Sequence, residues 1–169
     1  MCTLIIRWHP GDDWPLIIGG NRDEMKTRQS KPPGRHWPDR PEVIAGIDET
    51  AGGSWLGVND FGVVAAILNR SNSLGPKEGK RSRGELVLEA LDHADANDAV
   101  EAISNINEKA YRSFNMILAD NRDAFWLKHT ESDDIRINSI PEGISMITAD
   151  DLNDIESPRI AKYLQIIRE

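Results

Sequence analysis

The sequence has few cysteines and a deficit of basic residues. Its single cysteine, Cys2, excludes an internal disulfide, and the absence of CxxC and HExxH spacing excludes the common zinc sites. Twenty Lys and Arg against 28 Asp and Glu give a net charge of −8, which opposes binding to nucleic acid or to an anionic membrane surface. Nucleic acid is therefore not an expected partner.

Long apolar segments are missing as well. No stretch approaches the roughly 18 apolar residues of a membrane span, and the amino terminus lacks the apolar segment and cleavage site of a secretory signal. The length of 169 residues suffices to bury one full core. We therefore expect a cytoplasmic protein without a membrane span, folded as one domain over residues 1–169.

Apolar stretches predict nine strands in two groups. The first group comprises residues 2–8, 16–18, 43–47, 54–59 and 62–68. The second comprises residues 114–119, 124–128, 135–140 and 144–148, which we expect to form a second sheet. Because residues 63–68 are apolar throughout, this strand is predicted to be covered on both sides. Residues 29–42 contain four prolines and predict an irregular surface excursion.

Three helices are also predicted. Ser82 and Glu85 have capping-box spacing ahead of an apolar stretch that ends at Leu91. Asp98 and Glu101 repeat this spacing before a second helix, and the pair Ser157-Pro158 supplies a cap and a first-turn proline for a third. Together the elements indicate an α+β fold in which two packed, mainly antiparallel sheets are flanked by helices.

Cys2 is the first candidate for chemistry. If Met1 is removed, Cys2 carries both a thiol and a free α-amine, and their pKa values near ~8.5 and ~8 make proton transfer between them nearly thermoneutral. Cys2 would then be a nucleophile that carries its own base. A lone cysteine at the start of a strand is equally an ordinary packing residue.

Two strand ends carry the polar side chains that could assist Cys2. Asp23 could accept a hydrogen bond from the α-ammonium or thiol, and Arg22 could bind a carboxylate or phosphate, although an Arg–Asp salt bridge within the loop is the simpler reading. Asn69 follows the apolar strand and could donate to an oxyanion, although asparagine is also common in turns.

Several long motifs resemble one known family. They are MCTLII at the start, GGNRDE at 19–24, AGGSWLGVNDFGVVAAILNR at 51–70, SRGELVLEAL at 82–91, FNMILAD at 114–120 and SPRIAKYL at 157–164. These motifs resemble the NRDE family, also called the transport-and-Golgi-organisation-2 family. That family in turn resembles the N-terminal-nucleophile hydrolases of the choloylglycine hydrolase and penicillin acylase branch, which implies a four-layer αββα sandwich.

The resemblance also implies roles for individual residues. Cys2 matches the nucleophile of these hydrolases, Asn21 and Asp23 match the pair that orients it, and Asn69 matches their oxyanion asparagine. Where the hydrolases place an arginine before this pair, the chain has Gly20, and its arginine is displaced to position 22.

Three functions follow as hypotheses. The first is hydrolysis of a non-peptide amide bond in a small acylated amine through Cys2, which requires no cofactor. The second is a non-catalytic trafficking protein that binds haem, acyl-CoA or lipid in the same pocket, with Arg22 and Asn21 contacting the polar groups and Trp55 offering a flat apolar surface. The third is a structural protein with a decayed site, which the glycine at position 20 supports.

Overall fold

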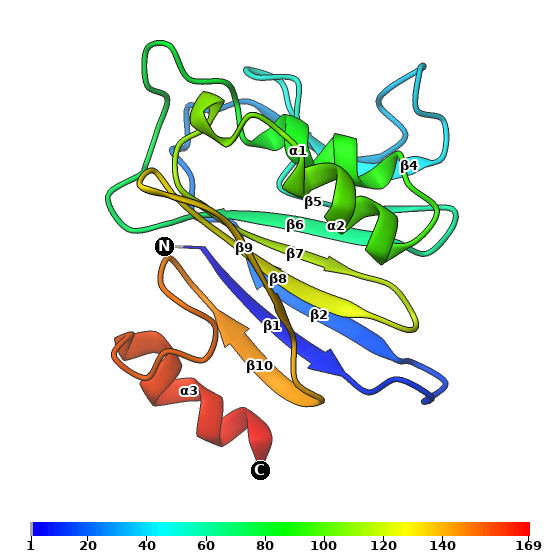
Figure 1. Ribbon diagram of the computed structural model, residues 1–169, viewed down its shortest axis with the longest axis vertical. Helices are drawn as coiled ribbons and strands as arrows, with labels where there is room; N and C mark the ends of the chain where they lie inside the picture. Colours follow the sequence, from blue (N-terminus) through cyan, green and yellow to red (C-terminus); the bar gives the residue numbers. More distant parts are fainter. Residues whose placement is uncertain (1) are drawn as a thin grey trace.

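The computed structural model describes residues 2–169, which form two antiparallel sheets and three α-helices (Figure 1). The strands of the smaller sheet, in spatial order, are β10 (Gly143–Ile147), β1 (Thr3–Trp8) and β2 (Leu16–Asn21). The larger sheet has the order β3 (Ser30–Gly34), β4 (Val43–Asp48), β5 (Leu56–Asn59), β6 (Val64–Asn69), β7 (Phe114–Ala119), β8 (Ala124–Thr130) and β9 (Asp133–Ser139). The helices are α1 (Gly84–Leu91), α2 (Ala96–Ser104) and α3 (Pro158–Arg168), with a short 3-10 helix, η1, at Glu108–Ala110.

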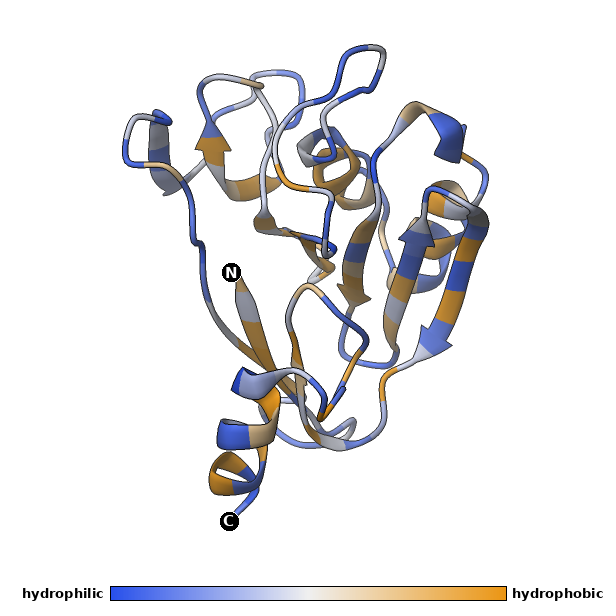
Figure 2. Ribbon diagram, turned by 90° about the vertical axis from the view of Figure 1, so that its left-hand side faces the viewer, coloured by the Kyte–Doolittle hydropathy of each residue, from blue (hydrophilic) through white to orange (hydrophobic). Residues whose placement is uncertain are grey.

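Four layers are stacked in the order helix, sheet, sheet, helix, which confirms the predicted αββα sandwich. One core lies between the larger sheet and the helices α1 and α2, and a second fills the space between the two sheets. A third, smaller core joins β10 to α3. Figure 2 shows the apolar bands that alternate with polar ones along the strands and along α3. None of the helices within residues 2–169 is long and apolar enough to cross a membrane.

The central strand β6 shows why residues 63–68 lack a polar face. Ala65 belongs to the core beneath the helices, whereas Ala66 and Leu68 belong to the core between the sheets. Successive side chains of a strand point to opposite faces, so a strand between two cores is apolar at every position. The prediction that this strand is covered on both sides is confirmed.

The predicted division of the strands between the sheets is wrong. We expected residues 114–148 to form a separate sheet, but β7 pairs with β6 from Val64 opposite Ala119 to Asn69 opposite Phe114, and β8 and β9 extend the same larger sheet. β10 instead pairs with β1, with Leu4 opposite Ile147. Apolar periodicity identifies strands but not their neighbours, because pairing partners far apart in sequence are chosen by packing.

Residues 29–42 are more regular than expected, because they include the strand β3. Pro32 and Pro33 are tolerated since β3 is an edge strand, which needs backbone donors on one side alone. The register of β3 on β4 shifts between Lys31 and Gly34, around these prolines.

The helix starts correct two predictions and confirm the third. Asp95 is the N-cap of α2, and its side chain accepts a hydrogen bond of 2.9 Å from the backbone of Asp98, so the predicted start at Asp98 is three residues too late. Ser157 and Pro158 begin α3 as predicted. The predicted Ser82–Glu85 capping box is not formed: the N-cap of α1 is Arg83, the Ser82 hydroxyl accepts from the backbone of Gly84 at 3.3 Å, and the Glu85 carboxylate binds Tyr111 and Arg81.

Candidate active site

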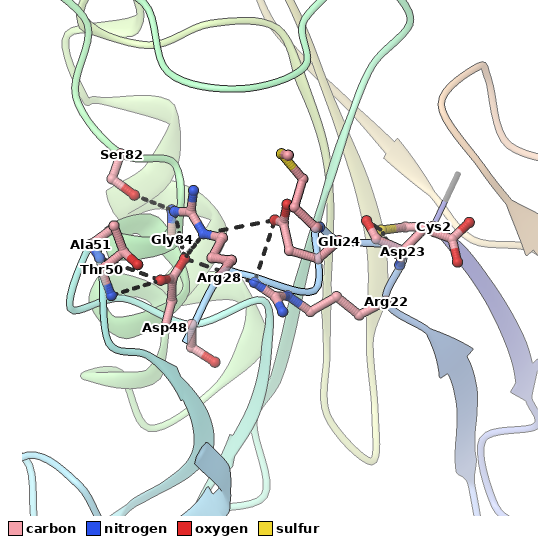
Figure 3. Close-up of polar contacts among 12 residues, drawn as sticks. Cys2, Arg22, Asp23, Glu24, Arg28, Asp48, Thr50, Ala51, Ser82 and Gly84 are labelled. Carbon is pink, nitrogen blue, oxygen red and sulfur yellow. Dashed lines mark hydrogen bonds and ion pairs between the residues drawn. The ribbon is translucent and has the colours of Figure 1, made fainter. Parts of the chain in front are cut away.

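The hairpin of β1 and β2 places Cys2 beside the segment that follows β2. Thr3 pairs with Asn21, so the residue before β1 and the residues after β2 are neighbours. The backbone N–H of Asp23 donates to the Cys2 Sγ at 3.4 Å, and this Sγ lies 3.8 Å from the Asp23 carbonyl oxygen (Figure 3). The thiol is half-buried and packs against the core between the sheets.

The Asp23 carboxylate is held by groups from two other elements. Asn21 donates from Nδ2 to Asp23 Oδ1 at 2.7 Å. Arg159, near the start of α3, lies with Nη1 4.0 Å from Asp23 Oδ2 and donates from the same nitrogen to Thr3 Oγ1 at 2.7 Å. The structure thus brings Cys2, Asn21 and Asp23 together and adds Arg159, which was not among the predicted site residues. Its one sequence signal was its place in the motif SPRIAKYL.

Arg22 points away from Cys2, toward a separate ionic cluster (Figure 3). Its guanidinium lies 4.3 Å from the centre of the Trp55 ring, 3.4 Å from Glu24 Oε2 and 3.9 Å from Asp48 Oδ2. Two of the three predicted ligand-binding side chains, Arg22 and Trp55, are therefore in direct contact, whereas the third, Asn21, faces Asp23. Arg22 pairs with Glu24 and Asp48, in place of the ion pair with its neighbour Asp23 that the simpler reading suggested.

Asp48 is the anion at the centre of this cluster. It accepts hydrogen bonds from Arg28 Nε at 2.7 Å and from the backbone N–H groups of Thr50 and Ala51 at 3.0 and 3.4 Å. Burial alone would raise the pKa of Asp48, but these hydrogen bonds outweigh it and lower the pKa below its ordinary value. Asp48 therefore stays ionised and fixes Arg28 and the turn at residues 48–52.

Gly20 is a glycine because two strands approach closely there. A Cβ at this position would lie 2.4 Å from Leu4 Cδ2 and 2.9 Å from the Thr3 carbonyl oxygen. An arginine at position 20, as in the hydrolases that the sequence resembles, does not fit this backbone. A cation reaches Asp23 from α3 instead, because Arg159 Nη1 lies 4.0 Å from Asp23 Oδ2.

Asn69 ends β6 at the end of the sandwich where β1 begins, and its position opposite Phe114 puts it on the helix-facing side of the larger sheet, with Ala65. The loop after Asn69 is bound to the segment after β10, because Ser71 donates from its backbone to the Ala149 carbonyl at 3.0 Å and from its hydroxyl to Asp150 Oδ1 at 2.7 Å. Since β10 pairs with the beginning of β1, this segment also lies beside the amino terminus of β1. Within residues 2–169, no group of three or more His, Cys, Asp or Glu side chains is arranged to hold a metal ion.

Sequence comparison assigns the chain to a family. The family model described as Transport and Golgi organisation 2 matches residues 1–168. The chain belongs to this family. The mouse Transport and Golgi organization 2 homolog is 31% identical over 131 residues, a match that covers 71% of this chain and 45% of that protein. The human homolog is 32% identical over 130 residues with the same coverage, so the match spans less than half the length of these relatives.

Solved structures share the fold of this Transport and Golgi organisation 2 family chain. A Caenorhabditis elegans ortholog of N-acylethanolamine-hydrolyzing acid amidase superposes with a TM-score of 0.70 at 14% identity, covering 99% of this chain and 80% of that chain. The C2A mutant of the conjugated bile acid hydrolase from Clostridium perfringens gives a TM-score of 0.58 at 15% identity, covering 99% of this chain and 58% of that chain. The chain therefore has the fold of N-terminal-nucleophile hydrolases.

Proposed function

We propose that this chain is an N-terminal-nucleophile amidohydrolase that cleaves the amide bond of a small acylated amine through Cys2. The observation that carries the proposal is the hydrogen bond from the Asp23 backbone N–H to the Cys2 thiol, which keeps the Asp23 carboxylate, held by Asn21, next to the residue that bears the thiol. Covalent catalysis needs a nucleophile with a base beside it and a third group that orients the base; in this proposal the base is the α-amine of Cys2 and the orienting group is Asp23. The similar worm protein is described as an ortholog of an amidase that hydrolyses N-acylethanolamines.

The proposed reaction begins with proton transfer from the thiol to the α-amine of the same residue. This step requires removal of Met1, which lies outside the described residues. The thiolate attacks the amide carbonyl carbon, and the carbonyl π electrons move to oxygen, where the side-chain amide of Asn69 donates a hydrogen bond worth about 3 kcal/mol in a dry site. The α-ammonium then protonates the leaving amine as the C–N bond breaks. Water hydrolyses the resulting thioester to release the acid and the free thiol.

The surrounding residues have separate roles in this mechanism. Asp23 accepts a hydrogen bond from the α-ammonium and stabilises its positive charge, while Arg159 and Asn21 hold the carboxylate in place. Trp55 offers an apolar contact to the substrate, and Arg22 lies across its ring face. Asn21, at the end of β2, offers a polar contact. A cytoplasmic location is part of the same proposal.

The alternative is a carrier that binds haem, acyl-CoA or lipid without catalysis. The observation that favours it is the contact of Arg22 with Trp55, because a cation over a flat aromatic ring suits an apolar ligand with an anionic group. Arg35 and Arg40 are weaker candidates for anion contacts, since they donate to Asp60 at 2.7 Å and to Asp92 at 2.8 Å, whereas the acidic oxygens nearest Arg22, on Glu24 and Asp48, lie at 3.4 and 3.9 Å.

The experiment that separates the two functions starts with the intact mass of the purified protein, which shows whether Met1 is removed. Hydrolysis of a panel of N-acylethanolamines is then measured for wild type, Cys2→Ala and Arg22→Ala. The hydrolase proposal expects turnover by wild type and none by Cys2→Ala, at an unchanged unfolding temperature. The carrier function would be established instead by a different set of results. Met1 is retained, the wild-type protein shows no turnover, and haem binding is weakened by Arg22→Ala but not by Cys2→Ala.

A further inference from the structure

A buried asparagine bridges the two sheets at the end where Cys2 and Asn69 lie. Asn115, on β7, is 0% exposed and directs its side chain into the space between the sheets. Its Nδ2 donates to the carbonyl oxygens of Thr148 at 3.1 Å and Asp150 at 2.7 Å. Its Oδ1 accepts from Arg70 Nη1 at 2.6 Å and from Trp126 Nε1 at 3.1 Å. One carboxamide therefore makes four hydrogen bonds, to three other segments of the chain.

Two of these segments carry the site. Arg70 directly follows Asn69, so the hydrogen bond that it donates to Asn115 fixes the backbone next to the proposed oxyanion donor. Thr148 and Asp150 follow β10, the strand that pairs with β1, and β1 begins one residue after Cys2. The Asn115 side chain thus connects the backbone beside Asn69 to the strand pair that carries the nucleophile.

No other side chain of similar size can make this set of hydrogen bonds. An amide supplies two N–H donors and an acceptor oxygen with two lone pairs, which matches the two carbonyls and the two N–H groups around Asn115. Aspartate has the same shape but cannot donate to the two carbonyls and would place a charge against them. Because the site is buried, each polar group left without a hydrogen-bond partner lowers the free energy of unfolding by the full cost of its desolvation.

We propose that Asn115 is a positioning residue that sets the separation and alignment of Asn69 relative to Cys2. The proposal rests on the hydrolase function for its effect on turnover. Its structural content, that one buried amide holds the two site residues in register across the sheets, is independent of turnover. Catalysis is sensitive to such alignment, since a displacement of about 1 Å can reduce a rate by about 10²-fold.

Asn59 provides a matched control at the opposite end of the larger sheet. It is 4% exposed, and its Nδ2 donates to the carbonyls of Leu91 at 2.9 Å and His93 at 2.7 Å. Its Oδ1 accepts from the backbone N–H groups of Phe61 at 3.1 Å and Val63 at 2.9 Å. Asn59 is therefore also buried and makes the same number of donated and accepted hydrogen bonds as Asn115, but it lies next to the start of β6, whereas Asn69 is at the end of β6.

The first test compares Asn115→Asp with Asn59→Asp. Both variants lose two donated hydrogen bonds, so both should unfold at lower urea concentration than wild type. We expect Asn115→Asp alone to lower kcat, by about 10²-fold, with KM changed less than kcat. An equal fall in kcat for the two variants, once each is measured well below its unfolding transition, would overturn the positioning role.

The second test needs no turnover and uses the fact that Cys2 is the single cysteine of the chain. Asn69→Cys introduces a second thiol, and dibromobimane, which fluoresces on bridging two neighbouring thiols, reports their proximity. We expect bridging in Asn69→Cys, a marked loss when Asn115→Asp is added, and no loss when Asn59→Asp is added. If these bridging results are obtained and the wild-type protein has no amidase turnover, the hydrolase function is refuted and the positioning role of Asn115 is supported. No bridging in Asn69→Cys, or equal bridging in both double variants, refutes the positioning role.

Discussion

Substitution of Gly20 by alanine tests the close strand approach that excludes an arginine from this position. The added Cβ would lie 2.4 Å from Leu4 Cδ2 and 2.9 Å from the Thr3 carbonyl oxygen, where non-bonded carbon contacts are normally about 3.5–4.0 Å. Leu4 is buried in the core between the sheets, and the Thr3 oxygen belongs to the backbone, so neither atom can move freely. We expect Gly20→Ala to lower the free energy of unfolding by about 1–3 kcal/mol.

Gly19 provides the control, because it is adjacent on the same strand. A Cβ there would meet no atom within 4 Å, and neither glycine has a backbone φ in the left-handed region. Gly19→Ala should therefore raise the free energy of unfolding by about 0.4–1 kcal/mol, through the reduced conformational entropy of the unfolded chain. The two neighbouring substitutions are expected to have opposite signs.

Urea unfolding followed by tryptophan fluorescence measures the difference. With a denaturant dependence of about 2 kcal/mol per M, a difference of about 2 kcal/mol between the variants separates their midpoints by about 1 M. Coincident midpoints would refute the argument that Gly20 is required by packing. Wild-type stability in Gly20→Arg would refute it more directly, because it would show that the hydrolase arginine fits at this position.

Two further predictions concern other parts of the chain. Asp95→Ala removes the α2 cap and should lower the free energy of unfolding by about 1 kcal/mol. Asp98→Ala removes only a first-turn charge and should lower it by about 0.3–1 kcal/mol at most. Equal shifts of the two thermal unfolding temperatures would contradict the assignment of Asp95 as the cap. Because the folded pKa of Asp48 is lowered, its stabilising effect is complete above about pH 4 and is lost as the pH falls through the folded pKa. Asp48→Asn should therefore be less stable at pH 7 and less acid-sensitive below about pH 4 in urea midpoints, and an unchanged acid sensitivity would refute this role.

Local sequence patterns predicted the elements of the fold but not their assembly. Strands such as β1 and β6 were predictable because the alternation or continuity of apolar residues reports directly on which faces are buried. The pairing of β6 with β7 was not, since 44 residues that include two α-helices and η1 separate Asn69 from Phe114, and no local pattern encodes that partner. The edge strand β3 was missed because its prolines argue against a strand unless its position at the sheet edge is known.

The contacts of the candidate site likewise fall into local ones, which the sequence predicts, and long-range ones, which it does not. Cys2, Asn21 and Asp23 could be predicted as neighbours because a hairpin joins two adjacent segments of sequence. Arg159 and Asn115 could not, because each reaches the site from a distant segment: Arg159 contacts Thr3 across 156 positions. Fold-level packing decides such contacts, so they become visible only when the layers are assembled.

The geometry of an extended chain explains why Arg22, the arginine next to Asp23 in the sequence, does not form an ion pair with it. Side chains at i and i+2 of an extended segment lie on one side and the residue between them lies on the other. Asn21 and Asp23 accordingly meet at 2.7 Å, and Arg22 is directed away, onto Trp55. Gly20 is excluded as a cation site by its contacts with β1. A side-chain cation beside Asp23 therefore comes from outside the hairpin: α3 supplies Arg159, with Nη1 4.0 Å from Asp23 Oδ2, in addition to the α-ammonium that the proposed mechanism places at Asp23.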